Sequence, residues 1–133
     1  MGYLRFSFSK IRLKHIGIDK DKTYTIRGNN SNENYTFLWS DFLVARSQSN
    51  YIEVFLNDPA ENKSTKVIIR NTLSKLISQL PEAVQVHRSY IINIDHLEEL
   101  HGNVRKGWCK IKGYRDEVPV SPKHFKAIKP KVV

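Results

Sequence analysis

The stretch "QVHRSYIIN", residues 85–93, joins two chemically different halves. Its second half, Tyr90 followed by two isoleucines, has the aromatic and β-branched side chains that favour a buried strand. Its first half places an imidazole, a guanidinium and a hydroxyl group side by side, on His87, Arg88 and Ser89. We therefore predict one central strand over residues 83–94 that begins at a polar site. That site is either catalytic or a surface that binds an anion.

The segments around this strand have mainly the sequence patterns of strands. Residues 50–56 alternate in polarity, residues 63–70 form a second apolar run, and the polar residues 57–62 between them predict a hairpin turn. Residues 28–34 are another polar turn. Further short strands are predicted at residues 35–39, 41–47, 96–100, 107–113 and 116–121.

Two segments have the periodicity of short helices. Residues 71–81 have Asn71 or Thr72 as N-cap and end at Pro81. The last helix begins with Ser121 as its cap and Pro122 at its first position. The apolar residues that share one helical face are Leu73, Leu76, Ile77 and Leu80 in the first segment, and Phe125 and Ile128 in the second.

The charge of the chain favours an anionic partner. Its 133 residues include 22 Lys and Arg against 13 Asp and Glu, a formal net charge of +9. Such a balance suits nucleic acid, an anionic membrane surface or an acidic protein. The single cysteine, Cys109, excludes an internal disulfide and a multi-cysteine zinc site, and it favours a reducing compartment. No apolar run reaches the ~18–20 residues of a membrane span.

Few features favour a catalytic or metal site. His87 and Ser89 would share a strand face, but no glycine-flanked nucleophile turn surrounds Ser89. The five histidines are scattered, and the six glycines form no phosphate-binding loop. We therefore expect a protein that is not an enzyme, with no catalytic residues, metal site or cofactor.

Three polar clusters favour the anion-binding explanation. They are "RSQSN" at residues 46–50, "HRS" at residues 87–89 and "SPKHFK" at residues 121–126. Each combines a cation or an amide with small hydroxyl groups, which bind phosphate oxygens, and Arg, Lys and Asn also bind base edges. Any one cluster is equally well explained as a cap, a turn or a surface cation. Three of them on a chain of net charge +9 shift the balance toward DNA.

Four segments, in this order and spacing, resemble the LytTR family of bacterial DNA-binding domains. They are "NYIEV", "RNTLSKLISQLP", "VHRSYIIN" and "VPVSPKHFKAIK", and "HRSYIIN" is highly specific. The resemblance divides the chain into a basic N-terminal extension or linker remnant, residues 1–24, and a LytTR-like domain, residues 25–133. It implies a mainly β fold, an elongated assembly of small antiparallel β-sheets with two short helices.

The resemblance also implies a function. LytTR domains bind double-stranded DNA sequence-specifically, through loops in successive major grooves, and recognise direct repeats in promoters. They are the output domains of response regulators in two-component systems, or of membrane-linked sensors. We therefore expect a cytoplasmic domain of a transcription regulator, joined to a receiver module or to a sensor that tethers it to a membrane. It would be a monomer alone and would pair on DNA.

Eight residues take roles from their positions in the family motifs. Asn50, Arg88 and Lys123 would contact bases. Contacts to the DNA backbone would come from Ser49, His87, Ser89, Ser121 and Lys126. Arg can donate two hydrogen bonds to guanine, and Asn can pair with adenine. The family more often has Arg where Pro122 stands, and some members have a longer side chain than Asn50, so both differences bear on the preferred base sequence.

Two other interpretations stay open at this point. One is a basic module that binds a membrane surface or a protein without reading DNA sequence. It is motivated by the alternating basic and apolar N-terminus, which includes Leu4, Phe6 and Phe8. The other is RNA binding, which exposed stacking aromatic residues would favour, although most aromatic residues here alternate into predicted core faces.

Overall fold

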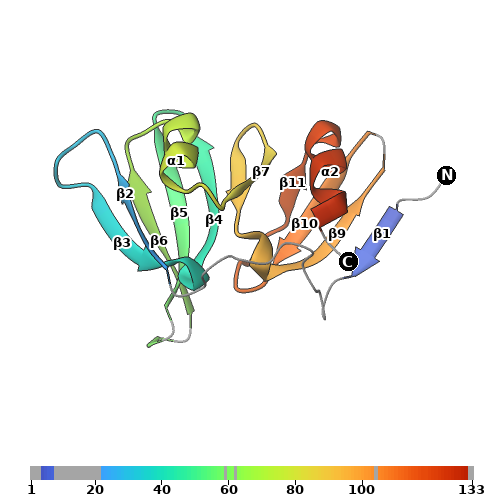
Figure 1. Cartoon of the computed structure of the whole chain (residues 1–133), viewed down its shortest axis with the longest axis horizontal. Coiled ribbons are helices and arrows are strands. Elements are labelled where there is room, and N and C mark those ends of the chain that lie inside the picture. The colour runs from blue at the N-terminus through green and yellow to red at the C-terminus, as the bar shows by residue number, and fades with distance from the viewer. Residues whose placement is uncertain (1–3, 8–21, 59, 62, 104, 132–133) are drawn as a thin grey trace.

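The computed structural model describes residues 4–7, 22–58, 60–61, 63–103 and 105–131. Three antiparallel sheets lie side by side along the long axis of the molecule (Figure 1). Two short α-helices and three single-turn 3₁₀ helices complete the described part of the chain. The prediction of a mainly β fold, with small antiparallel sheets and two short helices, is confirmed.

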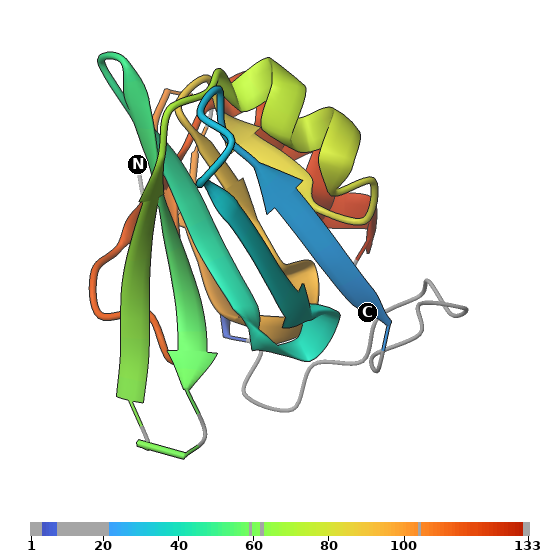
Figure 2. The same ribbon diagram turned by 90° about the vertical axis from the view of Figure 1, so that its left-hand side faces the viewer.

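The central sheet has five strands in the order β6-β5-β4-β8-β7. Their bounds are Phe42–Gln48 for β4, Tyr51–Asp58 for β5, Lys63–Ile69 for β6, Val84–His87 for β7 and Tyr90–Ile92 for β8. The predicted hairpin of β5 and β6 is present, with Ile52 opposite Ile69. Figure 2 shows that this hairpin ends far from the tight turn between β4 and β5, at the other end of the sheet.

The single strand predicted over residues 83–94 is wrong, because the chain turns back at Arg88 and Ser89. The two halves form the antiparallel pair β7 and β8, in which His87 lies opposite Tyr90. A straight strand of this length would extend roughly 40 Å, whereas its neighbour β4 has only seven residues. Folding back lets both apolar halves join the sheet, and it places the polar cluster at a turn.

The other two sheets are smaller. One has the order β1-β9-β10-β11, with bounds Leu4–Ser7, Leu97–Gly102, Gly107–Ile111 and Val118–Val120. The other pairs β2, Thr23–Arg27, with β3, Asn34–Leu38. Strands β1 and β2 thus include part of the segment predicted as an N-terminal extension, and the rest of it, 1–3 and 8–21, lies outside the described residues. The division of the chain at residues 24 and 25 stays a prediction.

Both helices begin at side-chain caps. The Thr72 hydroxyl accepts a hydrogen bond from the Lys75 amide (3.2 Å), so Thr72 rather than Asn71 caps α1, Leu73–Gln79. Ser121 caps α2, Pro122–Ile128, by accepting from the His124 amide. The apolar residues predicted to share the α2 face are buried, as are Leu73, Leu76 and Leu80 in and after α1. No helix in the described part of the chain is long and apolar enough to cross a membrane.

The middle of the central sheet, in β4 and β8, is buried on both faces, and a hydrophobic core lies on each side of it. Neighbouring residues point to opposite sides: Val44 and Ile92 belong to the core shared with β9, β10 and α2, whereas Ala45 and Ile91 belong to the core beneath α1. Strands buried on both faces have continuous apolar runs instead of alternation. This explains the apolar character of residues 42–45 and 91–92.

An ion-pair cluster around the buried Glu53 joins the three strands next to the β4–β5 turn. Glu53 of β5 is 5% exposed and accepts hydrogen bonds from Arg46 of β4 (2.6 Å) and Lys66 of β6 (2.8 Å). Burial alone would raise the pKa of Glu53, but the bonds from Lys66 and Arg46 outweigh it and lower that pKa below 4.5. The carboxylate therefore stays ionised and holds β4, β5 and β6 in register.

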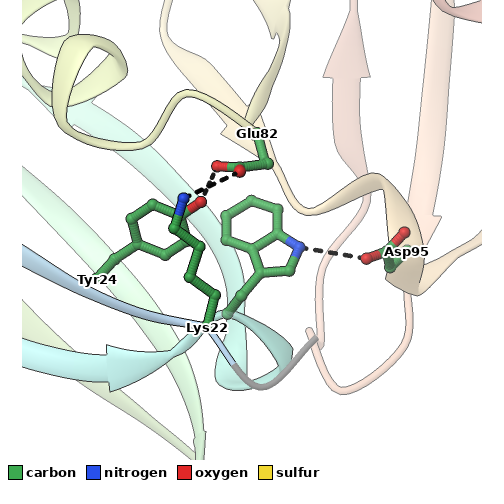
Figure 3. Close-up of polar contacts among 5 residues, drawn as sticks. Lys22, Tyr24, Glu82 and Asp95 are labelled. Atoms are coloured by element: carbon green, nitrogen blue, oxygen red, sulfur yellow. Dashed lines mark hydrogen bonds and ion pairs between the residues drawn. The ribbon is translucent and has the colours of Figure 1, made fainter. Parts of the chain in front are cut away.

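Trp39 connects the smallest sheet to the rest of the fold. It begins the 3₁₀ helix Trp39–Asp41, one residue beyond β3, where a strand residue was predicted. Its indole N–H donates to Asp95 (3.2 Å). Figure 3 shows Asp95 on one side of this region and, on the other, Lys22 and Tyr24 both directed at the Glu82 carboxylate.

Candidate nucleic-acid interface

The three predicted contact segments lie along one edge of the molecule, the upper edge in Figure 1. They are the β4–β5 turn with Asn50, the β7–β8 turn with Arg88, and the start of α2 with Lys123. Two backbone hydrogen bonds link them: Ser47 N–H donates to the Ser89 carbonyl (2.9 Å), and Ser121 N–H donates to the Val86 carbonyl (2.9 Å). Three segments that are distant in sequence thus form one continuous ridge, and all three predicted base-contacting side chains are exposed.

The first segment is a two-residue hairpin turn between the paired residues Gln48 and Tyr51. Ser49, its first central residue, has a φ of +47°, as the first position of a type II′ turn requires. Glycine usually occupies such a position because a β-carbon is strained there. The strained turn leaves Ser49 and Asn50 exposed at its tip, where both can reach a partner.

Ser49→Gly is expected to stabilise the fold by about 0.5–1 kcal/mol. Removing the backbone strain at the positive φ stabilises the folded state by roughly 1–2 kcal/mol. The greater conformational freedom of glycine in the unfolded chain lowers this gain by about 0.5–1 kcal/mol. Urea unfolding followed by circular dichroism measures the difference. Ser31→Gly is the matched control, since Ser31 is an exposed turn residue without a positive φ, and it should destabilise slightly. Equal shifts in both variants would rule out strain at Ser49.

The second segment owes its shape to His87. The Nδ1 atom of its ring accepts a hydrogen bond from the Ser89 amide (3.1 Å), and the ring lies edge-on to Tyr90 at 5.7 Å. Burial, and then the charge of Arg88, lower the pKa of His87 below 6.5. The imidazole is therefore neutral at pH 7, with Nδ1 occupied, and only its Nε2–H is left to donate to a phosphate. Arg88, at the tip of the turn, is exposed.

The third segment is more tightly bonded than the sequence indicates. The Ser121 hydroxyl and His124 Nδ1 are hydrogen-bonded to each other, while the His124 amide donates to the same hydroxyl oxygen. Burial, then Lys123 and His87, lower the pKa of His124, which keeps its ring neutral and able to accept. His124 lies three residues after the cap, the spacing at which a helix side chain can reach back to the N-cap residue, and this spacing could have identified its role. Pro122 fits the first helical position, where no amide donor is needed.

Charge distinguishes this ridge from the opposite edge. The segments 47–51, 86–90 and 121–129 contain no Asp or Glu, and they carry the exposed cations Arg88, Lys123, Lys126 and Lys129. The turns at the opposite edge, after β5 and after β10, mix both signs: Asp58 and Glu61 lie in one, and Asp116 and Glu117 in the other. An edge of one charge sign concentrates an oppositely charged partner.

Other kinds of site find less support. Across the described ranges, no three His, Cys, Asp or Glu side chains gather in a way that could hold a metal ion. An open cavity of about 550 Å³ lies at the opposite edge, where Asn57, Lys63, His96 and Lys112 are among its lining residues. No predicted contact residue lines it. Cys109 is buried, which raises the pKa of its thiol to about 12 and leaves it unreactive.

Comparison with known proteins identifies the family and agrees with the fold. The family model for the LytTr DNA-binding domain matches residues 32–132. Among solved structures, the fold is similar to the LytTr DNA-binding domain of a Bacillus cereus chain assigned as a methyl-accepting/DNA response regulator. The TM-score is 0.61 at 13% identity, over 80% of this chain and 94% of that one. A search of curated proteins finds no match. Because the family model covers most of the chain, this protein belongs to the LytTR family of DNA-binding domains.

Proposed function

We propose that the protein reads specific base sequences in double-stranded DNA, with its ridge of two turns and one helix start facing successive major grooves. The observation that carries this proposal is the ridge itself: three exposed candidate readers, on three segments that backbone hydrogen bonds join and that contain no Asp or Glu. Base contacts are assigned to Asn50, Arg88 and Lys123. Support for these roles comes from their exposure and chemistry, since Arg and Lys suit guanine and Asn suits adenine.

The backbone contacts are assigned to smaller or neighbouring groups. Ser49 and Lys126 are exposed, and His87, Ser89 and Ser121 are partly buried beside them. The Ser121 hydroxyl is already hydrogen-bonded to His124, so it would donate to a phosphate only if that bond were exchanged. The Ser89 hydroxyl and the His87 Nε2–H are the more available donors of the second turn, and they would fix the register of Arg88 on the duplex.

We further propose that this domain is the cytoplasmic output part of a bacterial transcription regulator. It would bind direct repeats in promoters, be a monomer alone, and be brought into pairs by a receiver or sensor module. Family membership supports DNA binding and transcription regulation in a two-component system. Two copies on adjacent repeats would double the contacts and raise affinity without any new interface.

Selection of bound duplexes from a random pool tests the proposal. The purified protein is incubated with the pool at about 0.15 M salt, where non-specific phosphate contacts are weakened, and bound duplexes are sequenced over several rounds. Enrichment of a short motif, repeated about one helical turn apart, is the expected result. Binding without enrichment would mean that the ridge holds phosphates alone, and the base-contacting roles would be withdrawn.

A further inference from the structure

We propose that the turn between β9 and β10 is a fourth DNA-binding element, in which Arg105 and Lys106 bind phosphates beyond the segment that α2 reads. This inference rests on the proposed function. It assigns a DNA contact to Arg105 and Lys106, two residues that have no role in that function so far. Figure 1 shows the turn on the same upper edge as the other three segments, next to α2. The footprint on DNA would therefore extend past Lys123 toward this end of the molecule.

Hydrogen bonds within the turn hold its described residues in place. The Asn103 amide donates to the Lys106 carbonyl (2.8 Å), and the Asn103 side-chain oxygen accepts from the Arg105 amide (2.8 Å) and the Lys106 amide (3.0 Å). These bonds pair the backbone amides of Asn103, Arg105 and Lys106 within the turn. Both basic side chains are left exposed.

Helix α2 holds the base of the turn. Gly102 and Gly107 lie opposite each other where β9 and β10 meet the turn. The Phe125 ring lies directly against both: an added β-carbon would be 2.8 Å from it at Gly102 and 3.3 Å at Gly107. Only glycine allows so close an approach at Gly102. The turn is therefore fixed to the same helix whose first residues are assigned to a major groove.

The two cations are available for a partner. None of the ion pairs in the described part of the chain includes Arg105 or Lys106. The segment 102–107 contains no Asp or Glu, like the other three segments. Two adjacent long cationic side chains suit the evenly spaced phosphates of a duplex.

The test compares Arg105→Ala/Lys106→Ala with a charge-matched control, Lys112→Ala/Arg115→Ala, in the mixed-charge turn at the opposite edge. Both pairs remove one Lys and one exposed Arg. Affinity for a duplex with the selected motif, and for a scrambled duplex, is measured across a salt series. Loss of two phosphate contacts, each worth about 0.9 in the slope of log K against log salt, should lower that slope by about 1.8 for both duplexes. The control should keep the wild-type slope.

The outcomes separate this inference from the proposed function. If the wild-type protein enriches no motif, the proposed function fails whatever the variants do. If the wild-type protein binds its motif and the Arg105/Lys106 variant keeps its full affinity and salt slope, the fourth contact is wrong. A variant that loses binding to anionic phosphatidylserine vesicles while its DNA slope is unchanged also overturns it. With a duplex shortened on the α2 side, wild type and variant should have the same affinity and the same salt slope. That result would further support the contact.

Discussion

Arg88→Ala is expected to weaken binding to the selected duplex by about 1–3 kcal/mol, or roughly 5- to 140-fold. The guanidinium is exposed at the tip of a turn whose backbone is held by His87 and by β4, so its direction is set without its own side-chain contacts. Two parallel hydrogen bonds to one guanine would then be lost. Fluorescence anisotropy with labelled duplexes measures the change.

Two variants show whether the effect belongs to base recognition. Arg88→Lys keeps the positive charge but loses the forked guanidinium. Compared with Arg88→Ala, it should therefore restore binding to scrambled DNA more than binding to the motif. Arg115→Ala removes an equally exposed arginine from the opposite edge and should change neither. If Arg88→Ala weakens both duplexes by the same factor, Arg88 binds phosphate, and the base contact assigned to it is wrong.

The sequence predicted best those features that depend on nearby residues. The alternation along residues 50–56 and the polar turn after them were sufficient to predict the β5–β6 hairpin. Each of these strands pairs with the one next to it in the sequence. The caps at Thr72 and Ser121 were also visible, because a helix cap involves residues three apart. In both cases the stabilising contact lies within a few residues of the pattern that predicts it.

Features that depend on distant partners were missed. Residues 83–94 read as one strand because a strand buried on both faces shows no alternation that would reveal a reversal. Strand β2 was missed for a different reason: although β3 follows it after a short polar turn, the five residues of β2 include only two apolar ones, Tyr24 and Ile26. No local pattern shows that the Asn93 side chain donates to the Trp39 carbonyl, 54 residues away.

For the candidate site, the sequence showed the chemistry and the structure showed the proximity. Polar clusters near residues 50, 88 and 123 could each be explained separately. Their place on one ridge follows from the strand order β5-β4-β8-β7 and from the Ser121–Val86 bond, which sets α2 beside β7. The β9–β10 turn joins the same edge only because Phe125 packs on its two glycines, a contact that side-chain types alone do not indicate.

Trp39→Ala is expected to have the largest effect on stability, a loss of about 3–5 kcal/mol in the free energy of unfolding. The side chain is fully buried, with its ring 5.5 Å from that of Phe42 and 5.6 Å from that of Tyr24. Its removal would leave a cavity that these rigid neighbours cannot fill, and would leave Asp95 without the indole donor (Figure 3). Urea unfolding followed by far-ultraviolet circular dichroism measures the loss.

Two further variants, Trp39→Phe and Trp108→Ala, show which contacts of Trp39 account for this loss in the free energy of unfolding. Trp39→Phe keeps most of the aromatic packing and loses the bond to Asp95, so it should cost only about 1–2 kcal/mol. Trp108 is partly exposed and stacks on His101 at 4.0 Å, so its replacement by alanine should cost less than that of Trp39. A loss below about 1 kcal/mol for Trp39→Ala would mean that the core beneath α1 repacks freely. Because Trp39 lies at the end of β4 remote from Asn50, a Trp39→Ala protein that still folds should select the same DNA motif as the wild type.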